Sequence, residues 1–210
     1  RQDYRKTSIG NHYSGIRHLL ITTSLIAIFV CYAILNLKNL QVEELIILPI
    51  TFFLGNLTVY LIHRFPMHQN FKLIKFIFRN HTLYHHYLFD ENAMEYKSQS
   101  DFKMILLSPI LIFFVLFILI LPPHLILSNV LSNNVGYLFL MLGALYMGFY
   151  EWMHLSFHTP KTHWINRIPW ISWMRRHHKI HHQKSIMSQV NFNIVCPIFD
   201  LIFNTFRKAL

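Results

Sequence analysis

The chain has 210 residues, of which 53% are hydrophobic, and its 19 Lys and Arg outnumber nine Asp and Glu to give a formal net charge of +10. Its length fits one domain. The basic excess alone would suit nucleic-acid binding, but the distribution described below indicates membrane topology, so we expect no nucleic-acid partner. The two cysteines, Cys31 and Cys196, are too few for a disulfide framework or a cysteine-based zinc site.

Four apolar runs follow one another along the chain, at about residues 18–35, 45–62, 104–121 and 135–153. The only Asp, Glu, Lys or Arg within them is Glu151, near the end of the fourth run. As a helix, a run of this length spans roughly 27 Å, which is close to the hydrocarbon thickness of a bilayer. The sequence therefore predicts an all-α integral membrane protein with four transmembrane helices and a single domain over residues 1–210.

The basic residues predict which side of the membrane each segment occupies. All but Lys38 lie before the first run, between the second and third runs, or after the fourth. Because basic residues stay in the cytosol, both termini and the central segment are predicted to be cytosolic. The outer connections, residues 36–44 and 122–134 with the Pro122-Pro123 break, are then expected to be hairpin turns. Residues 63–103 and 154–210 are predicted to form a cytosolic helical cap, on a bacterial inner membrane or the endoplasmic reticulum.

Ten of the 15 histidines form four groups within the two cytosolic segments. The groups are His63 and His68; His81, His85 and His86; His154 and His158; and His178, His181 and His182. Residues three or four apart on a helix share a face, and Pro66 should end the preceding helix and let His68 turn back toward His63. Imidazole suits Fe, Zn, Cu and Ni, and ten imidazoles suit two ions better than one. We therefore predict a two-metal site, and expect His12, His18 and His124 to be ordinary interfacial residues.

At these histidines the sequence resembles the fatty acid hydroxylase superfamily, which includes sterol desaturases, sphingolipid and fatty acid hydroxylases, and carotenoid hydroxylases. The boxes of that family, HX3-4H, HX2-3HH and a final HX2-3HH, match His63/His68, His81/His85/His86 and His178/His181/His182. The pair His154/His158 resembles an additional pair of the hydroxylase branch.

The tail of the chain extends this resemblance. Asn191-Phe192-Asn193 is similar to the closing NFG segment of the family, and residues 199–205 are similar to its WDxLFGT segment. The sequence departs from that pattern at Asn193 and Asn204, where Gly is usual, and at Phe199, where Trp is usual.

The resemblance implies an O2-dependent enzyme with two iron ions, in which the dimetal centre itself is the catalytic group. Such an enzyme hydroxylates or desaturates a C–H bond of a membrane lipid, such as a fatty acyl chain, a sphingolipid or a sterol, and a carotenoid is the alternative substrate. Imidazole ligands also accept Zn, so Zn in the purified protein is an alternative occupant. Because the sequence has no haem, flavin or cysteine-cluster motif, electrons are expected from an external cytochrome b5 or ferredoxin with its reductase.

Six further residues are candidates for orienting the ligands or for extra coordination. A ligating imidazole usually donates its other N–H to an acid or a carbonyl, which makes nearby acids of interest. Glu151 precedes His154 by three residues, and an acid near the end of a membrane span is costly unless it has a partner. The full set is Glu151, His163, His177, Asn191, Asp200 and Asp101.

Two other functions use similar residues. A di-zinc membrane hydrolase could be built on the same ligands, although the sequence has no evident nucleophile or base motif for it. A metal transporter would need polar ligands along the spans, whose interiors offer little beyond Thr51, Asn56 and Thr58. We therefore favour the oxidoreductase.

Overall fold

The computed structural model describes residues 5, 9–10 and 12–208, and this part of the chain consists of helices and loops without a β-strand. The chain forms two compact units. Unit 1 comprises Arg1–Gly15, Asn56–Leu106 and Glu151–Leu210, and unit 2 comprises Ile16–Gly55 and Leu107–Tyr150. The all-helical fold class predicted from the sequence is confirmed for the described residues.

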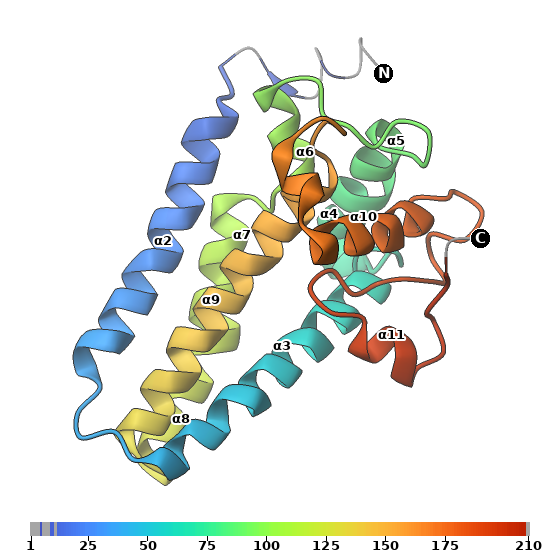
Figure 1. Cartoon of the computed structure of the whole chain (residues 1–210). Helices are drawn as coiled ribbons and strands as arrows, with labels where there is room; N and C mark the ends of the chain where they lie inside the picture. Colours follow the sequence, from blue (N-terminus) through green and yellow to red (C-terminus); the bar gives the residue numbers. More distant parts are fainter. Residues whose placement is uncertain (1–4, 6–8, 11, 209–210) are drawn as a thin grey trace. The chain divides into compact units, whose positions relative to one another are not determined.

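Unit 2 contains the long apolar helices (Figure 1). Its elements are α2 (Gly15–Asn36), η1 (Val42–Ile46), the first part of α3 (Ile47–Arg64), α7 (Pro109–Phe114), η5 (Val115–Ile120), α8 (Leu121–Val130) and most of α9 (Asn133–Phe157). By length and composition, three helical stretches of the described chain can cross a membrane: Gly15–Asn36, Val42–Arg64 and Pro109–Val130. Only 22% of each apolar window is buried inside the protein. Since so much apolar surface is costly in water, these helices indicate a membrane protein.

The fourth predicted span lies within α9, a helix of 25 residues. This helix is not among the three stretches that qualify by length and composition. Tyr137, Tyr146 and Glu151 lower its hydropathy, and many of its side chains are buried by protein rather than exposed. A count of four spans therefore stays a prediction.

The third predicted span was placed wrongly. The sequence predicted one helix over residues 104–121, but the chain leaves the helical conformation at Leu106, and the spanning stretch begins at Pro109. Ser108 is extended, with ψ of 146°, because the residue before a proline is driven away from the helical region. The Ser108 side chain accepts a hydrogen bond from Leu111 N, so this serine and Pro109 together start the helix.

The prediction that Pro122-Pro123 lies in a hairpin turn was also wrong, because both prolines lie inside the helical stretch Pro109–Val130. They occupy the first turn of α8, directly after the π-helical segment η5. A first-turn position needs no intrahelical N–H donor, and the wider π-turn before it accommodates the missing hydrogen bonds. The connection to α9 is consequently much shorter than predicted.

Two short connections in unit 2 are tied together by hydrogen bonds. Asn134 accepts from Lys38 N at 3.0 Å, and its amide donates to Lys38 O and to Glu44 Oε2, each at 2.8 Å. Ser132 Oγ donates to Glu44 Oε1. Asn134 therefore joins the connection after α2 to the start of α9 within this unit.

Asn134→Ala tests this connection. The substitution removes the hydrogen bonds between the buried Asn134 side chain and the Lys38 backbone, together with its bond to Glu44, so we expect the free energy of unfolding to fall by about 1 kcal/mol. The measurement is denaturant unfolding of the purified chain in detergent. The exposed neighbour provides the control, because Asn133→Ala should change stability by less than about 0.5 kcal/mol. Equal effects of the two variants would contradict this role.

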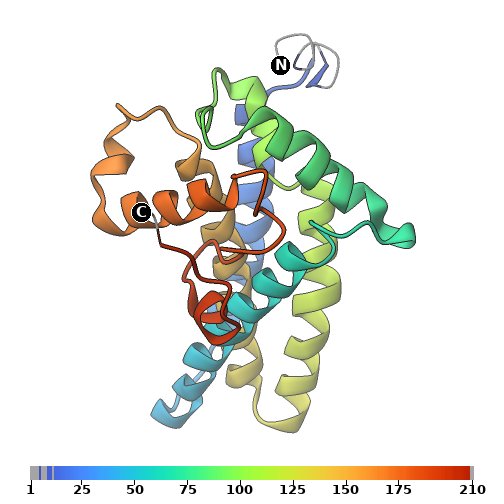
Figure 2. The same ribbon diagram turned by 90° about the vertical axis from the view of Figure 1, so that its right-hand side faces the viewer.

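Unit 1 is built from short helices and the ends of the two long ones (Figure 2). Its shorter elements are η2 (Lys72–Ile74), α4 (Lys75–Phe78), η3 (Arg79–His85), α5 (His86–Leu88), η4 (Gln99–Asp101), α6 (Phe102–Ile105), η6 (Trp164–Arg167), α10 (Pro169–His181) and α11 (Ile198–Ile202). The segments α4, η3 and α5 follow one another as one continuous helical rod, of which η3 is π-helical. The helical spacing of His81 and His85 predicted a helix here, but not its π-helical turns.

A small aromatic core holds the C-terminal tail of unit 1. Tyr60 on α3 packs against Phe192 and Phe199, with ring centroids 5.7 and 6.3 Å away. Leu57 and Ile198 cover this core. The tail that resembles the family's closing segments is thereby fixed to the same helix that carries His63.

Candidate metal centre

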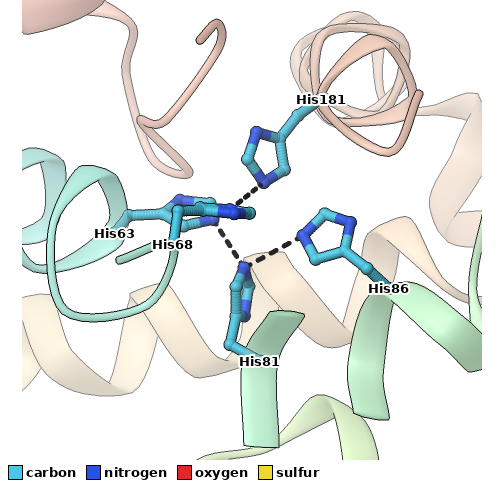
Figure 3. A group of neighbouring side chains, drawn as sticks. All are labelled: His63, His68, His81, His86 and His181. Atoms are coloured by element: carbon cyan, nitrogen blue, oxygen red, sulfur yellow. Dashed lines mark hydrogen bonds between the residues drawn. The ribbon is translucent and has the colours of Figure 1, made fainter. Parts of the chain in front are cut away.

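Five histidines converge in a first group, called group one (Figure 3). Its members are His63, His68, His81, His86 and His181, all of them buried. One nitrogen from each ring lies within 4.8 Å of one nitrogen of every other ring. They come from α3, the turn after it, η3, α5 and α10, so segments far apart in the sequence meet at this point.

A second set of five buried histidines forms group two: His85, His154, His158, His178 and His182. The same limit of 4.8 Å applies among its ring nitrogens. The two groups are neighbours within unit 1, because the rings of His86 and His182 are 4.3 Å apart and those of His81 and His85 are 5.1 Å apart. The structure thus brings together all ten histidines that the sequence selected, and divides them five and five.

Local backbone geometry decides this division. At the end of α10, His178 and the capping residue His182 are four residues apart and belong to group two, while His181 belongs to group one. In η3 and α5 the partner of His81 is His86, five residues on, with Nε2 atoms 3.1 Å apart. A π-helix brings residues near five apart onto one face, and such turns are frequent at functional sites. Sequence reasoning placed His81 and His85 on one face and missed that they serve different groups.

The turn after α3 agrees with the prediction made from Pro66. The helix ends at Arg64, and the ring of His68 returns to stack on that of His63, with centroids 5.4 Å apart and an interplanar angle of 27°. Met67 N donates to Ile62 O at 3.1 Å, which closes this turn.

Backbone carbonyls fix the protonation of half of the rings. The Nδ1 atom donates to Phe192 O in His63, Met104 O in His85, Met94 O in His158, Val190 O in His181 and Phe89 O in His182. A carbonyl oxygen only accepts, so the proton of each neutral ring must be on Nδ1. The Nε2 atom of each of these rings is therefore unprotonated, and its lone pair is free to bind a metal ion.

Thr82 fixes the protonation of His68 in the same way. The Thr82 hydroxyl donates its only proton to Met67 O at 2.6 Å, and therefore accepts from His68 Nδ1 at 3.2 Å. The His68 Nε2 atom is then also unprotonated. It lies 3.1 Å from His181 Nε2, one of the contacts drawn as dashed lines in Figure 3.

The distances between these Nε2 atoms show whether the histidines could hold a metal ion. His68 and His181 in group one, and His85 and His182 in group two, face each other through unprotonated nitrogens 3.1 Å apart. Two such lone pairs repel each other, and a cation between them turns the repulsion into coordination. Metal–imidazole bonds of about 2.0–2.1 Å fit this separation. The donor set therefore fits one metal ion in each group.

Burial keeps these rings neutral and ready to coordinate. Burial, followed by the nearby His63 and His85, lowers the pKa of His68 to about 2. Burial also lowers the pKa of His85 to about 3, although its hydrogen bond to Met104 acts in the opposite direction. The pKa values of His81, His86, His158, His178, His181 and His182 are lowered as well, first by burial and next by a neighbouring histidine. The lone pairs are consequently available to a metal at neutral pH.

The other six candidates lie outside both groups. His177 and Asp200 contact each other, with His177 Nε2 3.1 Å from Asp200 Oδ2. Asp101 accepts from Arg5 at 2.7 Å and from Lys97 N at 2.8 Å. These acids hold backbone segments of unit 1 in place and are not members of a metal group.

Asn191 and His163 also hold local structure. Asn191 donates to His177 O at 2.9 Å and accepts from Arg207 N at 2.8 Å. His163 accepts from Ile165 N and starts η6. Glu151 is buried in α9, and the pKa of Tyr13 is raised by burial and, to a smaller extent, by the charge of Glu151. The residues that orient the ligand rings are mainly backbone carbonyls, which sequence reasoning could not identify.

The comparisons with known proteins agree with this site. Residues 48–205, well over half of the chain, match the family model described as fatty acid hydroxylase. The chain belongs to the fatty acid hydroxylase family. No curated protein and no solved structure matched the chain.

All three departures from the fatty acid hydroxylase pattern have a place in the structure. Asn204 stands where Gly is usual and has φ of 55°, a left-handed conformation that Asn tolerates better than most residues. Asn193 uses its side chain instead, accepting from Phe199 N and Asp200 N at 3.0 and 3.2 Å. It thereby holds the start of α11. Phe199, in place of Trp, lies in the aromatic core with Tyr60.

The lowered pKa values predict how stability depends on pH in the metal-free chain. Unfolded histidines titrate near 6.5, whereas the folded ones protonate only at lower pH. Stability is therefore complete above pH 6.5 and falls as the pH drops below it, by about 1.4 kcal/mol per pH unit for each such histidine. Thermal unfolding of the chelator-treated chain at several pH values measures this. An unfolding temperature that stays constant from neutral pH to about pH 5 would contradict the burial of neutral rings.

Thr82→Val tests how the rings are oriented. The variant keeps the shape of the side chain but removes the oxygen that accepts from His68 Nδ1, so we expect metal affinity in group one to fall roughly 10–100-fold. Competition with a metal chelator measures the affinity. Thr51→Val is the matched control, because Thr51 is a buried threonine whose hydroxyl donates to Ile47 O within α3. An unchanged affinity in Thr82→Val would exclude this role for Thr82.

Proposed function

We propose that the chain is a di-iron, O2-dependent oxidoreductase that hydroxylates or desaturates a C–H bond of a membrane lipid. The observation that carries the proposal is the pair of neighbouring groups of five buried histidines, whose unprotonated Nε2 atoms face one another. Membership of the fatty acid hydroxylase family supports the class of reaction.

The ligand set supports two ions that act together. The rings of His178 and His181, which belong to different groups, have centroids only 5.7 Å apart. Two ions held this way would share one reaction space. Imidazole by itself accepts Fe, Zn, Cu or Ni, so iron rather than zinc is inferred from the family and not from the ligands.

The protein would hold, orient and shield the reactive centre. When bound, two ferrous ions supply the ability to activate O2 for attack on an unreactive C–H bond. The carbonyl-anchored rings keep the ligands in place, and the burial of all ten histidines excludes water. Apolar helices would let the chain receive a lipid from the bilayer. The histidine-bearing unit and both termini are proposed to face the cytosol, at a bacterial inner membrane or the endoplasmic reticulum.

The reaction needs electrons from outside the chain. Hydroxylation of one C–H bond consumes one O2, two electrons and two protons, and releases one water with the alcohol. The sequence has no haem, flavin or iron–sulfur motif to store those electrons. We therefore propose an external one-electron carrier, of the cytochrome b5 or ferredoxin type with its reductase.

The decisive experiment is metal analysis and turnover of anaerobically purified protein in lipid nanodiscs. We expect two iron ions per chain, Mössbauer spectra of non-haem iron, and incorporation of one atom of labelled O2 into a lipid when a reduced carrier is supplied. Lipid analysis of cells with and without the gene would then identify the substrate.

Matched variants sharpen this experiment. His182→Ala should abolish turnover and metal binding by group two. His12 is an exposed histidine outside both groups, so His12→Ala should change neither turnover nor metal binding. Hydrolysis of a lipid by a zinc-loaded form without O2 consumption would refute the oxidoreductase and favour a di-zinc hydrolase.

A further inference from the structure

Asp200 is a fully buried carboxylate at the centre of the C-terminal tail. Its Oδ1 atom accepts from Phe192 N at 2.8 Å and from the Thr205 hydroxyl at 2.7 Å. Its Oδ2 atom accepts from Asn193 N at 2.8 Å and from His177 Nε2 at 3.1 Å. Four donors around one carboxylate stabilise its charged form. Asp200 is thus a fixed negative charge in a part of unit 1 that lies beside group one.

One peptide unit connects this charge to a histidine of group one. The N–H of the peptide between Phe192 and Asn193 donates to Asp200 Oδ2, and the C=O of the same peptide accepts from His63 Nδ1. Each hydrogen bond in such a chain polarises the next one. A carboxylate at the N–H end makes the carbonyl more negative, which strengthens its pull on the His63 N–H and makes Nε2 a stronger donor.

His181 has a similar chain of two hydrogen bonds, but that chain ends on a neutral group instead of a carboxylate. Its Nδ1 atom donates to Val190 O at 2.9 Å, and the N–H of that same peptide, Asn191 N, donates to Thr205 O at 3.0 Å. The arrangement is the same as for His63, but it ends on an uncharged carbonyl. Within group one, His63 therefore has an anionic connection that His181 does not have.

His177 competes for the same oxygen. Its ring packs against those of Trp173 and Phe206, with centroids 6.2 and 5.3 Å away, and its Nε2–H shares Asp200 Oδ2 with Asn193 N. A second donor on Oδ2 lowers the negative charge that polarises the Phe192–Asn193 peptide, and so weakens the effect of Asp200 on His63. Removing it should strengthen the connection, while removing the carboxylate should weaken it. The two changes thus have opposite expected signs.

We propose that Asp200 is a positioning residue that acts through the Phe192–Asn193 peptide on His63, and so makes the metal ion of group one more tightly held. This inference rests on the proposed function, because it assumes that group one binds a metal. His177 limits the effect by sharing the carboxylate.

Titration of the metal-free full chain with Co²⁺ tests the proposal, because the visible bands of Co²⁺ report binding without requiring enzyme activity. We expect wild type to bind two ions. Asp200→Asn should weaken one of the two binding phases roughly 10–100-fold and leave the other unchanged. His177→Phe, which retains a ring packed against Trp173 and Phe206, should tighten that phase.

Thr205→Val is the control for loosening of the tail, because it removes a donor from Oδ1 and leaves the Oδ2 contacts in place. It should weaken neither phase. Weakening of the same phase by His177→Phe or Thr205→Val, or unchanged binding in Asp200→Asn, would overturn the proposal. A wild type that binds no Co²⁺ would overturn the proposed function instead. If Asp200→Asn does not fold, tighter binding in His177→Phe supports the proposal, and unchanged or weaker binding overturns it.

Discussion

The site depends on hydrogen bonds between the Nδ1 atoms of its histidines and backbone carbonyls. Five rings are held in this way, and Thr82 holds His68. Each bond fixes a ring orientation and places an unprotonated Nε2 atom toward the group centre. Burial then keeps the rings uncharged. Without an ion, buried lone pairs 3.1 Å apart repel each other, so the folded chain favours metal binding.

Much of this site could be predicted from the sequence because the histidines recur at helical spacings. His178, His181 and His182 at the C-terminal end of α10 show why, since three residues on a little over one turn must project from nearby positions. The division into two groups could not be predicted. It depends on the π-helical turns of η3, which join His81 to His86 rather than to His85. Likewise, the carbonyls that anchor the rings belong to residues such as Met94 and Val190, whose side chains give no signal.

The membrane part shows the limits of reading apolar runs alone. Hydropathy identified the first two spanning stretches, but the third was displaced because Pro109 starts a helix rather than lying within one. Pro122 and Pro123 were interpreted as a turn, although the π-helical segment before them lets the helix continue. In both places the position of a proline relative to the helix start decided the outcome, and composition does not contain that information.

The central claim is that each group of five imidazoles holds one metal ion. X-ray absorption spectroscopy of the metal-loaded chain, combined with metal analysis, tests it most directly. The account predicts two ions per chain, a first shell of nitrogen and oxygen at about 2.0–2.2 Å, and the outer-shell scattering that is characteristic of several imidazoles. A sulfur shell, or a single ion per chain with few imidazole ligands, would contradict it.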